Sequence, residues 1–241
     1  MKKNNFFVVI ILGTAHLIST PGKQSPDGRL RECEYSREII SDIKAKLEAY
    51  GYTVFIDYEP LEPKPEWTAA RKRLGYTKGE QAMELDYRAE QVNAICRKYG
   101  KEHCLYVSIH VNGAGDDGKW HGAGGWAAFT TPGETKADAL AECLYDAALS
   151  NLKRYVDIID EGKLRGDYTE KQVPFRMDNK DGDRDLEANL AVLRKTACPA
   201  VLTENLFQDN RRDVDFLLSD EGRHAIERLH VEGIIKYIES L

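Results

Sequence analysis

The chain has 241 residues, with 34 lysines and arginines against 40 aspartates and glutamates, which gives a formal net charge of −6. This length suits one medium-sized domain with its own buried core. With 42% hydrophobic and 31% charged residues and a mean hydropathy of −0.52, the composition is typical of a globular protein and excludes a membrane channel. The acidic balance argues against nucleic acid as a substrate, because phosphate binding needs clustered lysine and arginine.

The apolar run at residues 6–12 has two interpretations. Because Lys2 and Lys3 precede it, the run imitates the charged and hydrophobic regions of a secretory signal. It is short, however, no small-x-small cleavage site follows it, and Gly13 bounds it as it would a buried parallel strand. We therefore expect a strand here and no convincing signal peptide, which leaves the export route open.

Helical and strand patterns alternate along the rest of the chain. Ile39, Ile43 and Leu47 recur at helical spacing and Gly51 follows them, which predicts a helix that ends near residue 50. A proline-containing loop is expected at residues 58–65 and a glycine-rich loop at residues 113–125. The alternation predicts an α/β sandwich. The predicted helices cover residues 34–50, 85–99, 135–155, 186–193 and 226–241, and the predicted strands residues 6–12, 52–57, 105–109, 126–130 and 200–203.

Residues 157–185 interrupt this alternation, because they are charged and polar with little periodicity. We expect an irregular excursion that forms a mobile flap over or beside the functional cleft and not a layer of the core. No internal repeat, low-complexity tract or second domain is visible, so residues 1–241 are expected to form a single domain.

The five cysteines are odd in number, widely spread and contain no C-x-x-C pair. This pattern suggests neither a disulfide framework nor a cysteine-rich zinc site. We expect reduced thiols that are mostly part of the core, since free cysteine behaves as a small hydrophobe. The cysteines are Cys33, Cys96, Cys104, Cys143 and Cys198.

Four side chains stand where an open α/β sheet places its ligands, outside the carboxyl ends of the strands. His16 follows the first strand, His110 ends the third and Glu204 ends the fifth, while Glu32 begins the first long helix. Two imidazoles and one carboxylate form a tripod that leaves one tetrahedral position for water, as a hydrolytic zinc site requires. A further carboxylate can serve as the base for that water.

On spacing alone, His16 and His110 are better interpreted as hydrogen-bonded loop histidines than as metal ligands. The other four histidines are assigned to that structural role. His121 is the least secure of them, because it lies in the glycine-rich loop near the proposed site. These four are His103, His121, His224 and His230.

Longer stretches of sequence favour the metal site. Two segments are the most specific: Ser-Ile-His-x-Asn at residues 108–112 and Pro-Ala-Val-Leu-Thr-Glu-Asn-x-Phe at residues 199–207. These two segments occur in the order and spacing of a known family and, together with three further stretches, resemble the zinc-dependent N-acetylmuramoyl-L-alanine amidases of the type 3 amidase family. The resemblance extends over nearly the whole chain and includes residues 11–16, 20–39, 105–115, 124–141 and 198–210.

The resemblance implies one α/β domain with a twisted, mostly parallel sheet flanked by helices on both faces, of the phosphorylase/hydrolase-like kind. It implies one Zn²⁺ per chain, held by His16, Glu32 and His110, with Glu204 assisting catalysis. The chain departs from the family in one place, because Ala15 and Leu17 flank His16 where the family commonly has a Gly-His-Gly-Gly turn.

Several neighbouring residues have competing interpretations. Glu34 lies two residues from Glu32, but the family's ligand stands 19 residues before the helix-ending glycine, and 51 − 19 = 32. Arg88 and Asn112 are candidate substrate-binding residues; the alternatives are a salt-bridged helix residue for Arg88 and a loop-stiffening residue for Asn112. Trp126 is interpreted as a core residue of its strand, although it and Trp120 could stack on sugar.

The resemblance therefore predicts a peptidoglycan hydrolase that cleaves the amide bond between N-acetylmuramic acid and the L-alanine of the stem peptide. Its substrate places the action at the cell wall, periplasmic or extracellular, and some amidases of this type carry an inserted segment that plugs the zinc. No nucleic acid partner and no integral membrane segment are expected, and the oligomeric state is left open. Two alternatives remain at this point: a zinc peptidase that cuts within the stem peptide, and a non-catalytic wall-binding module that has kept the fold.

Overall fold

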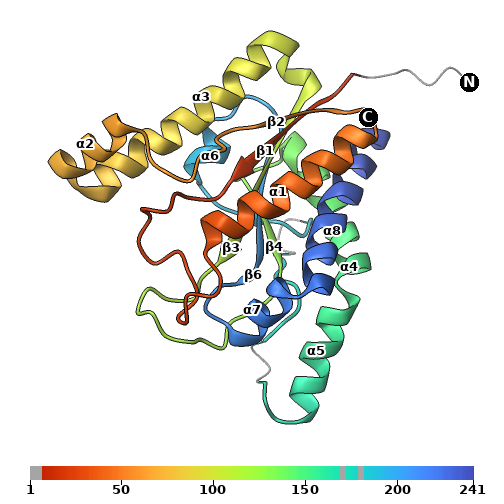
Figure 1. The fold of residues 1–241 in the computed structure, drawn as a ribbon. Coiled ribbons are helices and arrows are strands. Elements are labelled where there is room, and N and C mark those ends of the chain that lie inside the picture. The colour runs from red at the N-terminus through yellow and green to blue at the C-terminus, as the bar shows by residue number, and fades with distance from the viewer. Residues whose placement is uncertain (1–6, 169–171, 179–181) are drawn as a thin grey trace, which may run out of the picture.

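The computed structural model describes residues 7–168, 172–178 and 182–241. In these parts of the chain six strands form one sheet (Figure 1). Four of them are parallel, while the fifth in order runs antiparallel to its inner neighbour and parallel to the outermost strand. The predicted α/β fold with a mostly parallel sheet is confirmed. The order is β2 (Thr53–Ile56), β1 (Val9–Thr14), β3 (Cys104–Asn112), β6 (Ala200–Phe207), β4 (Ala127–Thr130) and β5 (Leu186–Glu187).

Helices cover both faces of this sheet (Figure 1). Alternate residues of β1 contribute to two separate cores, with Ile10 and Leu12 on one side and Val9 and Ile11 on the other. Every residue of β1 is buried, as expected for a central parallel strand covered on both faces. One core includes α1 (Glu32–Ala49), α4 (Lys136–Asn151) and α8 (Asp220–Ser240), and the other includes α3 (Ala82–Tyr99) and α6 (Ala191–Arg194).

The proline-rich connection after β2 is only in part the predicted loop. It leads into the helix α2 (Pro65–Gly75) and the π-helical turn η1 (Tyr76–Gln81), which join directly onto α3. Pro65 occupies the first turn of α2, where its missing N–H has no helical partner to lose. Trp67 fixes this helix to the body, because it is buried against Tyr58. The last proline of the loop thus marks the start of a helix that sequence analysis missed.

Near the carboxyl terminus, two further details differ from the prediction. The segment expected as a short helix over residues 186–193 divides into β5, which pairs with β4, and the single turn α6. The short helix α7 (Arg211–Leu218) was also missed. It begins at Asn210, whose side-chain oxygen accepts hydrogen bonds from the amides of Arg212 and Asp213.

The prediction for residues 157–185 is wrong in its first part. A helix, α5 (Lys153–Leu164), follows α4 after a break at Leu152, and its Tyr155 and Ile159 are fully buried. At Gly162 a Cβ atom would lie 1.8 Å from the ring of Tyr168, so this helix needs glycine for that packing. Residues 169–171 and 179–181 lie outside the described residues, and a lid or autoinhibitory role for the segment stays a prediction.

The remaining part of the segment runs beside β4. The amide of Arg176 donates to the carbonyl of Trp126, and Phe175 forms an isolated bridge with Trp126. Trp126 itself is fully buried, which confirms the prediction that it is a core residue. Four of the five cysteines are buried, as expected. Within the described residues, no helix has the length and apolarity needed to cross a membrane.

The connections α2–η1 and η2 (Lys101–His103) flank α3 at its two ends. The amino terminus of α3 points toward the carboxyl edge of the sheet, since Gln81 and Glu84 line the same pocket as the residues that follow β1 and β3. The opposite end of α3 reaches the starts of β3 and β6. The two ends of α3 therefore lie at opposite edges of the sheet.

Candidate metal centre

Two neighbouring strands and the helix between them position the predicted ligands. His16 lies two residues beyond the end of β1, Glu32 is the first residue of α1, and His110 lies near the end of β3. Glu204 of β6 is the register partner of His110, so the two side chains leave the sheet side by side. The fold therefore brings together all four residues that the sequence singled out.

The three predicted ligands form a compact cluster. His16 Nε2 lies 3.5 Å from Glu32 Oε2, and His110 Nδ1 lies 2.9 Å from Glu32 Oε1. The two imidazole rings are perpendicular, with centroids 5.1 Å apart. One ligand atom from each residue lies within 4.8 Å of the other two. Within the described residues, this is the one group of three or more His, Cys, Asp and Glu side chains that could hold a metal ion.

The donor set fits a zinc ion. Tetrahedral zinc with ligands at about 2.0–2.1 Å separates its ligand atoms by about 3.4 Å, which matches the 3.5 Å between His16 and Glu32. Glu32 is 1% exposed and its Oε2 atom has no hydrogen-bond partner among the described residues. A buried carboxylate oxygen without a donor is costly, and a bound cation would remove that cost.

The electrostatics give these residues the protonation states that a metal needs. Burial lowers the pKa of His16 to about 3, so its imidazole is neutral at physiological pH. Burial alone would raise the pKa of Glu32, but the proton that His16 carries at low pH, the hydrogen bond with His110 and the charge of Lys23 outweigh it and lower this pKa to about 2. Neutral imidazole and ionised carboxylate are the forms that bind zinc.

Glu204 has a different environment. Its Oε2 atom is buried and has no hydrogen-bond partner within the described part of the chain. Burial raises the pKa of Glu204 well above its usual range, and the negative charge of Glu32 adds to this effect. Two carboxylates near one site with opposite pKa shifts are the pattern expected when one holds a metal and the other moves protons.

The backbone at His16 is unusual, because its φ angle is 42°, a left-handed conformation that few residues other than glycine adopt. The surrounding hydrogen bonds hold it there. Arg88 Nη2 donates to the His16 carbonyl at 3.3 Å, and Arg37 Nη1 donates to the Ala15 carbonyl at 2.9 Å. The Ala15 amide in turn donates to Ser36 Oγ at 2.9 Å.

Arg88 is therefore part of a buried network behind His16. It is 2% exposed and forms ion pairs at 2.9 Å with both Asp57 and Glu84. Its Nη1 atom also donates to Thr14 Oγ1 at 2.7 Å. Arg88 is thus a salt-bridged residue, as the alternative interpretation predicted, although its ion pairs are buried and not on the surface. A contact between Arg88 and substrate stays a prediction.

Asn112 lies apart from the ligand cluster, beyond a register shift in β3. Its side-chain oxygen accepts a hydrogen bond from the Gly113 amide at 2.8 Å, which ties it to its own loop. This contact agrees with the loop-stiffening alternative, and a substrate contact by Asn112 is not tested. Glu34 lies outside the cluster as well, with a side chain that is 45% exposed.

Two residues of the site were missed by sequence analysis. Lys23 Nζ lies 3.8 Å from Glu32 Oε2, and Asn205 Nδ2 donates to the His110 carbonyl at 2.9 Å. Asn205 Oδ1 accepts from the indole of Trp126, so this asparagine connects a core residue to a ligand. Asn205 stands beside Glu204 in the segment used for the resemblance, and that position could have identified it. Lys23 lies in another stretch used for the resemblance, residues 20–39, but no feature of the sequence relates it to Glu32.

Two of the remaining histidines have partners that agree with the predicted structural role. His230 is buried, with its ring nitrogens 2.8 Å from Thr203 Oγ1 and 2.7 Å from the Ile226 carbonyl. His121 lies 2.9 Å from Asp117 in the glycine-rich loop.

A pocket of about 240 Å³ opens beside the ligands. Its walls come from the layer formed by α3 and α6 and from the strands β1, β3 and β6 with the residues that follow β1, and Leu190 and Val192 are among its apolar lining residues. The lining includes His16, Lys23, Arg88, Ser108, His110 and Glu204.

Comparison with known proteins decides the family. Residues 8–236 match the family described as N-acetylmuramoyl-L-alanine amidase. The chain belongs to this amidase family. It is 30% identical over 155 residues to the endolysin of Bacillus phage SPP1, a match that covers 64% of this chain and 45% of the endolysin. It is 25% identical over 238 residues to the N-acetylmuramoyl-L-alanine amidase AmiC of Neisseria meningitidis serogroup B, which covers 96% of this chain and 53% of AmiC.

Solved amidase structures share the fold. The CwlD amidase from Clostridioides difficile, solved in complex with the GerS lipoprotein, superposes with a TM-score of 0.64 at 20% identity and covers 97% of this chain and 100% of the CwlD chain. An N-acetylmuramoyl-L-alanine amidase from Clostridium difficile 630 gives a TM-score of 0.66 at 16% identity, covering 97% of this chain and 98% of that one. The amidase family chain described here spans about half the length of the curated relatives it matches.

Proposed function

We propose that this chain is a zinc-dependent N-acetylmuramoyl-L-alanine amidase. It hydrolyses the amide bond between the lactyl group of N-acetylmuramic acid and the L-alanine of the stem peptide. The observation that carries this proposal is the cluster of His16, Glu32 and His110 beside Glu204, in a chain whose residues 8–236 match the amidase family.

His16, Glu32 and His110 would hold one zinc ion per chain. Bound there, zinc supplies Lewis acidity toward the scissile carbonyl and toward water. The hydrogen bond from the Val111 amide to Glu32 Oε1 at 3.1 Å orients that carboxylate, and Asn205 fixes the backbone that carries His110. Such contacts behind the ligands set their direction and their affinity for the metal.

Glu204 is the proposed proton carrier. Its side chain leaves β6 next to His110, and its Oε2 atom has no competing partner among the described residues. The raised pKa of Glu204 in the metal-free chain means that this carboxyl is easily protonated, and a nearby cation would favour its ionised form. The ionised carboxylate accepts the proton of the attacking water, and the acid form delivers it to the leaving amine.

The side chains of His16 and His110 are 18% and 13% exposed, so a part of each imidazole reaches solvent. Lys23, at the rim, has a 35% exposed side chain and offers a positive charge to a substrate carboxylate. We propose peptidoglycan as the substrate and action at the cell wall, outside the cytoplasm. Residues 1–241 form the proposed single catalytic domain, and residues 8–236 of it match the amidase family.

Digestion of purified peptidoglycan followed by mass analysis of the fragments tests this proposal. We expect intact stem peptides with a new amino-terminal alanine, no new sugar reducing ends, and loss of the products when a chelator is present. Purified protein should contain about one zinc per chain by elemental analysis. Glu204→Gln, which keeps the volume of the side chain, is the matched inactive control.

Other products would point to other functions. New free amines on residues other than L-alanine would indicate a peptidase, and new reducing ends would indicate a glycosidase. A purified protein that binds peptidoglycan but contains no zinc and releases nothing would be a wall-binding module. Full activity in strong chelator would refute the zinc mechanism.

A further inference from the structure

Three cysteines from three separate segments meet at the opposite edge of the sheet from the metal centre. Cys96 lies in the last turn of α3, Cys104 begins β3, and Cys198 precedes β6. All three belong to the same core cluster and are at most 7% exposed. The Cys96 thiol interacts with those of Cys198 and Cys104. The proposed amidase chemistry uses none of these thiols.

An asparagine on α3 holds Cys96 close to Cys198. Asn93 Nδ2 donates to the carbonyl of Lys195 at 2.8 Å, and the amide of Ala197 donates to Asn93 Oδ1 at 2.9 Å. Cys96 lies three residues after Asn93 and therefore on the same side of the helix. Cys198 follows Ala197 directly, so this pair of hydrogen bonds fixes the two cysteines against each other.

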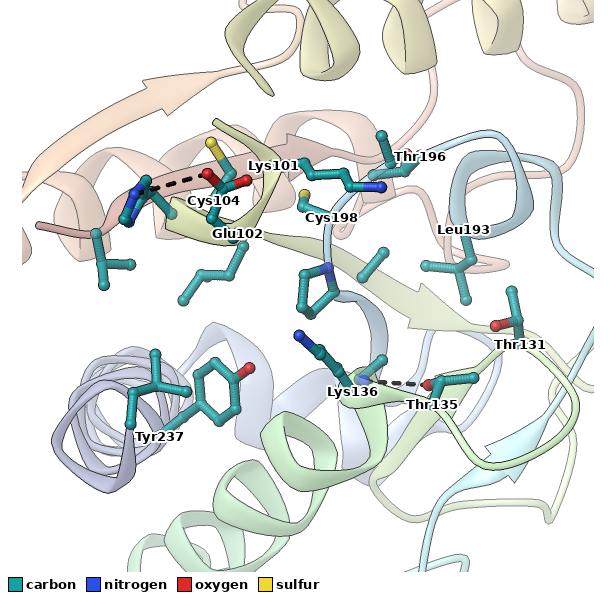
Figure 2. A pocket seen from close by; sticks show the side chains of 18 of the residues that line it. Lys101, Glu102, Cys104, Thr131, Thr135, Lys136, Leu193, Thr196, Cys198 and Tyr237 are labelled. Carbon is teal, nitrogen blue, oxygen red and sulfur yellow. Dashed lines mark hydrogen bonds and ion pairs between the residues drawn. The ribbon is translucent and has the colours of Figure 1, made fainter. Parts of the chain in front are cut away.

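Small molecules can reach this pair from two sides. A hollow of about 660 Å³ is lined by Cys104 and Cys198, and Figure 2 shows Cys198 next to Lys101 on its upper wall. A second, open hollow of about 420 Å³ is lined by Cys96. Lys101 and Ala197 border both hollows, which places the three thiols between them.

We propose that Cys96 and Cys198 are a dithiol pair that hydrogen peroxide converts into an intramolecular disulfide in the folded protein. The Cys96 thiolate attacks one peroxide oxygen, the O–O bond breaks, and the departing hydroxide takes up the thiol proton to leave as water. The Cys198 sulfur then attacks the resulting sulfenic acid, the S–O bond breaks, and a second water leaves. Two thiols lose two electrons and two protons, and one peroxide becomes two waters.

The electrostatics assign the order of these steps. A hydrogen bond from Cys198 lowers the pKa of Cys96 to about 7, which makes Cys96 the more reactive nucleophile. The same hydrogen bond, together with burial, raises the pKa of Cys198. Since this effect on Cys198 depends on the negative charge of Cys96, oxidation of Cys96 to a neutral sulfenic acid removes it and frees Cys198 to react.

The disulfide would join the last turn of α3 to the start of β6. These two elements also carry Arg88 and Glu204. The bond closes a loop of about 100 residues, and such a long loop constrains the unfolded chain strongly. We therefore expect the oxidised protein to unfold at a higher denaturant concentration than the reduced protein.

Peptide mapping of the folded protein after peroxide treatment tests the proposal. Remaining thiols are alkylated under denaturing conditions and the protein is digested with trypsin without reduction. Cleavage at Arg97 and Lys101 separates Cys96 from Cys104, so the linked pair is unambiguous. We expect a Cys96–Cys198 linked peptide that is two hydrogens lighter than its two parts, together with an increased denaturation midpoint.

Three variants complete the test. In Cys198→Ser we expect no linked peptide, no shift of the midpoint, and a sulfenic acid at Cys96 that dimedone traps. Cys96→Ser should form neither product. Cys143→Ser, a half-buried cysteine of α4, should behave as wild type. Quantitative alkylation of Cys96 after peroxide treatment of the wild type, a link between Cys96 and Cys104, or a link between two chains would each overturn the proposal.

Discussion

Arg88 offers the sharpest test of how the fold supports the candidate metal centre. Its guanidinium is 2% exposed and lies 2.9 Å from a carboxylate oxygen of both Asp57 and Glu84. Arg88→Met keeps most of the side-chain volume but leaves two buried carboxylates without their shared cation. Breaking a buried ion pair in this way destabilises a protein by about 3–5 kcal/mol.

The loss should be nearer to 3 than to 5 kcal/mol, for a reason that is visible in the network. Burial already raises the pKa of Glu84, so this carboxyl can take up a proton when its partner is removed. Asp57 keeps two neutral donors, the Thr14 amide at 2.9 Å and the Tyr106 hydroxyl at 3.0 Å. Urea unfolding of the metal-free variant measures this part of the effect.

Arg88→Met should also weaken zinc binding, because Arg88 supports the left-handed backbone of His16 through its carbonyl. Removing a group behind a metal ligand lowers affinity by about 10- to 100-fold. Competition against a chromophoric chelator measures it. Arg88→Lys keeps the charge without the planar fork and should fall between the variant and wild type.

Arg97→Met is the matched control, since it lies on the same helix with a 62% exposed side chain paired to Glu90. It should change stability by less than about 0.5 kcal/mol and leave zinc affinity unchanged. If Arg88→Met loses stability but keeps wild-type zinc affinity, Arg88 is structural and does not position His16. If it loses less than about 1 kcal/mol, the buried ion pairs do not stabilise the fold as argued here.

Three further predictions concern carboxylates. Glu32→Ala should lower zinc affinity and regain part of its activity in excess zinc, whereas Glu34→Ala should do neither; metal titration with an activity assay distinguishes them. Glu204→Gln should retain zinc while kcat falls by about 10²- to 10⁴-fold, and metal loss in this variant would make Glu204 a ligand. Burial raises the pKa of Asp213 to about 7, so between pH 4 and 7 the folded state holds a proton that the unfolded state has lost. The free energy of unfolding should therefore decrease as pH rises through that window, by about 4 kcal/mol for this group. Asp213→Asn should flatten this part of the pH dependence in chemical unfolding, and an unchanged slope would refute the assignment.

Strong local patterns made the central sheet predictable. The run at residues 6–12 and the helix ending at Gly51 carry continuous apolar or helical periodicity, and β1 and α1 form there within a few residues of the expected bounds. Such patterns predict secondary structure correctly because the residues of each buried face recur at regular spacing within one segment. The alternation of helices and strands along the chain then predicts one layer of helices on each face of the sheet.

The missed helix α5 shows where this reasoning fails. Only a narrow stripe, formed by Tyr155, Ile159 and Gly162, is buried, while most of the remaining residues of the helix are charged. Averaged over a window, that composition is typical of a loop. The stripe is stabilised by residues outside the helix, such as Tyr168 beside Gly162 and Phe216 beside Tyr155. Because these partners lie outside the segment, its own sequence could not predict the packing.

The residues of the candidate site could be singled out from the sequence, whereas the contacts that support them could not. The four residues His16, Glu32, His110 and Glu204 stand in recognisable segments, so the sequence could bring them together through a resemblance. Arg88 acts through the carbonyl of His16, 72 residues away, and Lys23 acts through its distance from Glu32. Relations of this kind are set by tertiary structure alone.

The departure from the family's glycine-rich turn has a structural explanation in the helix that sequence analysis missed. Leu17, which replaces a glycine next to His16, is 1% exposed and forms a small core with Tyr58 and Trp67. Trp67 belongs to α2, and without that helix Leu17 would lie on the surface. A bulky residue after the ligand thus requires an apolar neighbour beyond β2, and α2 supplies it. The His16 backbone keeps its left-handed conformation because packing on one side and the Arg88 network on the other both hold it.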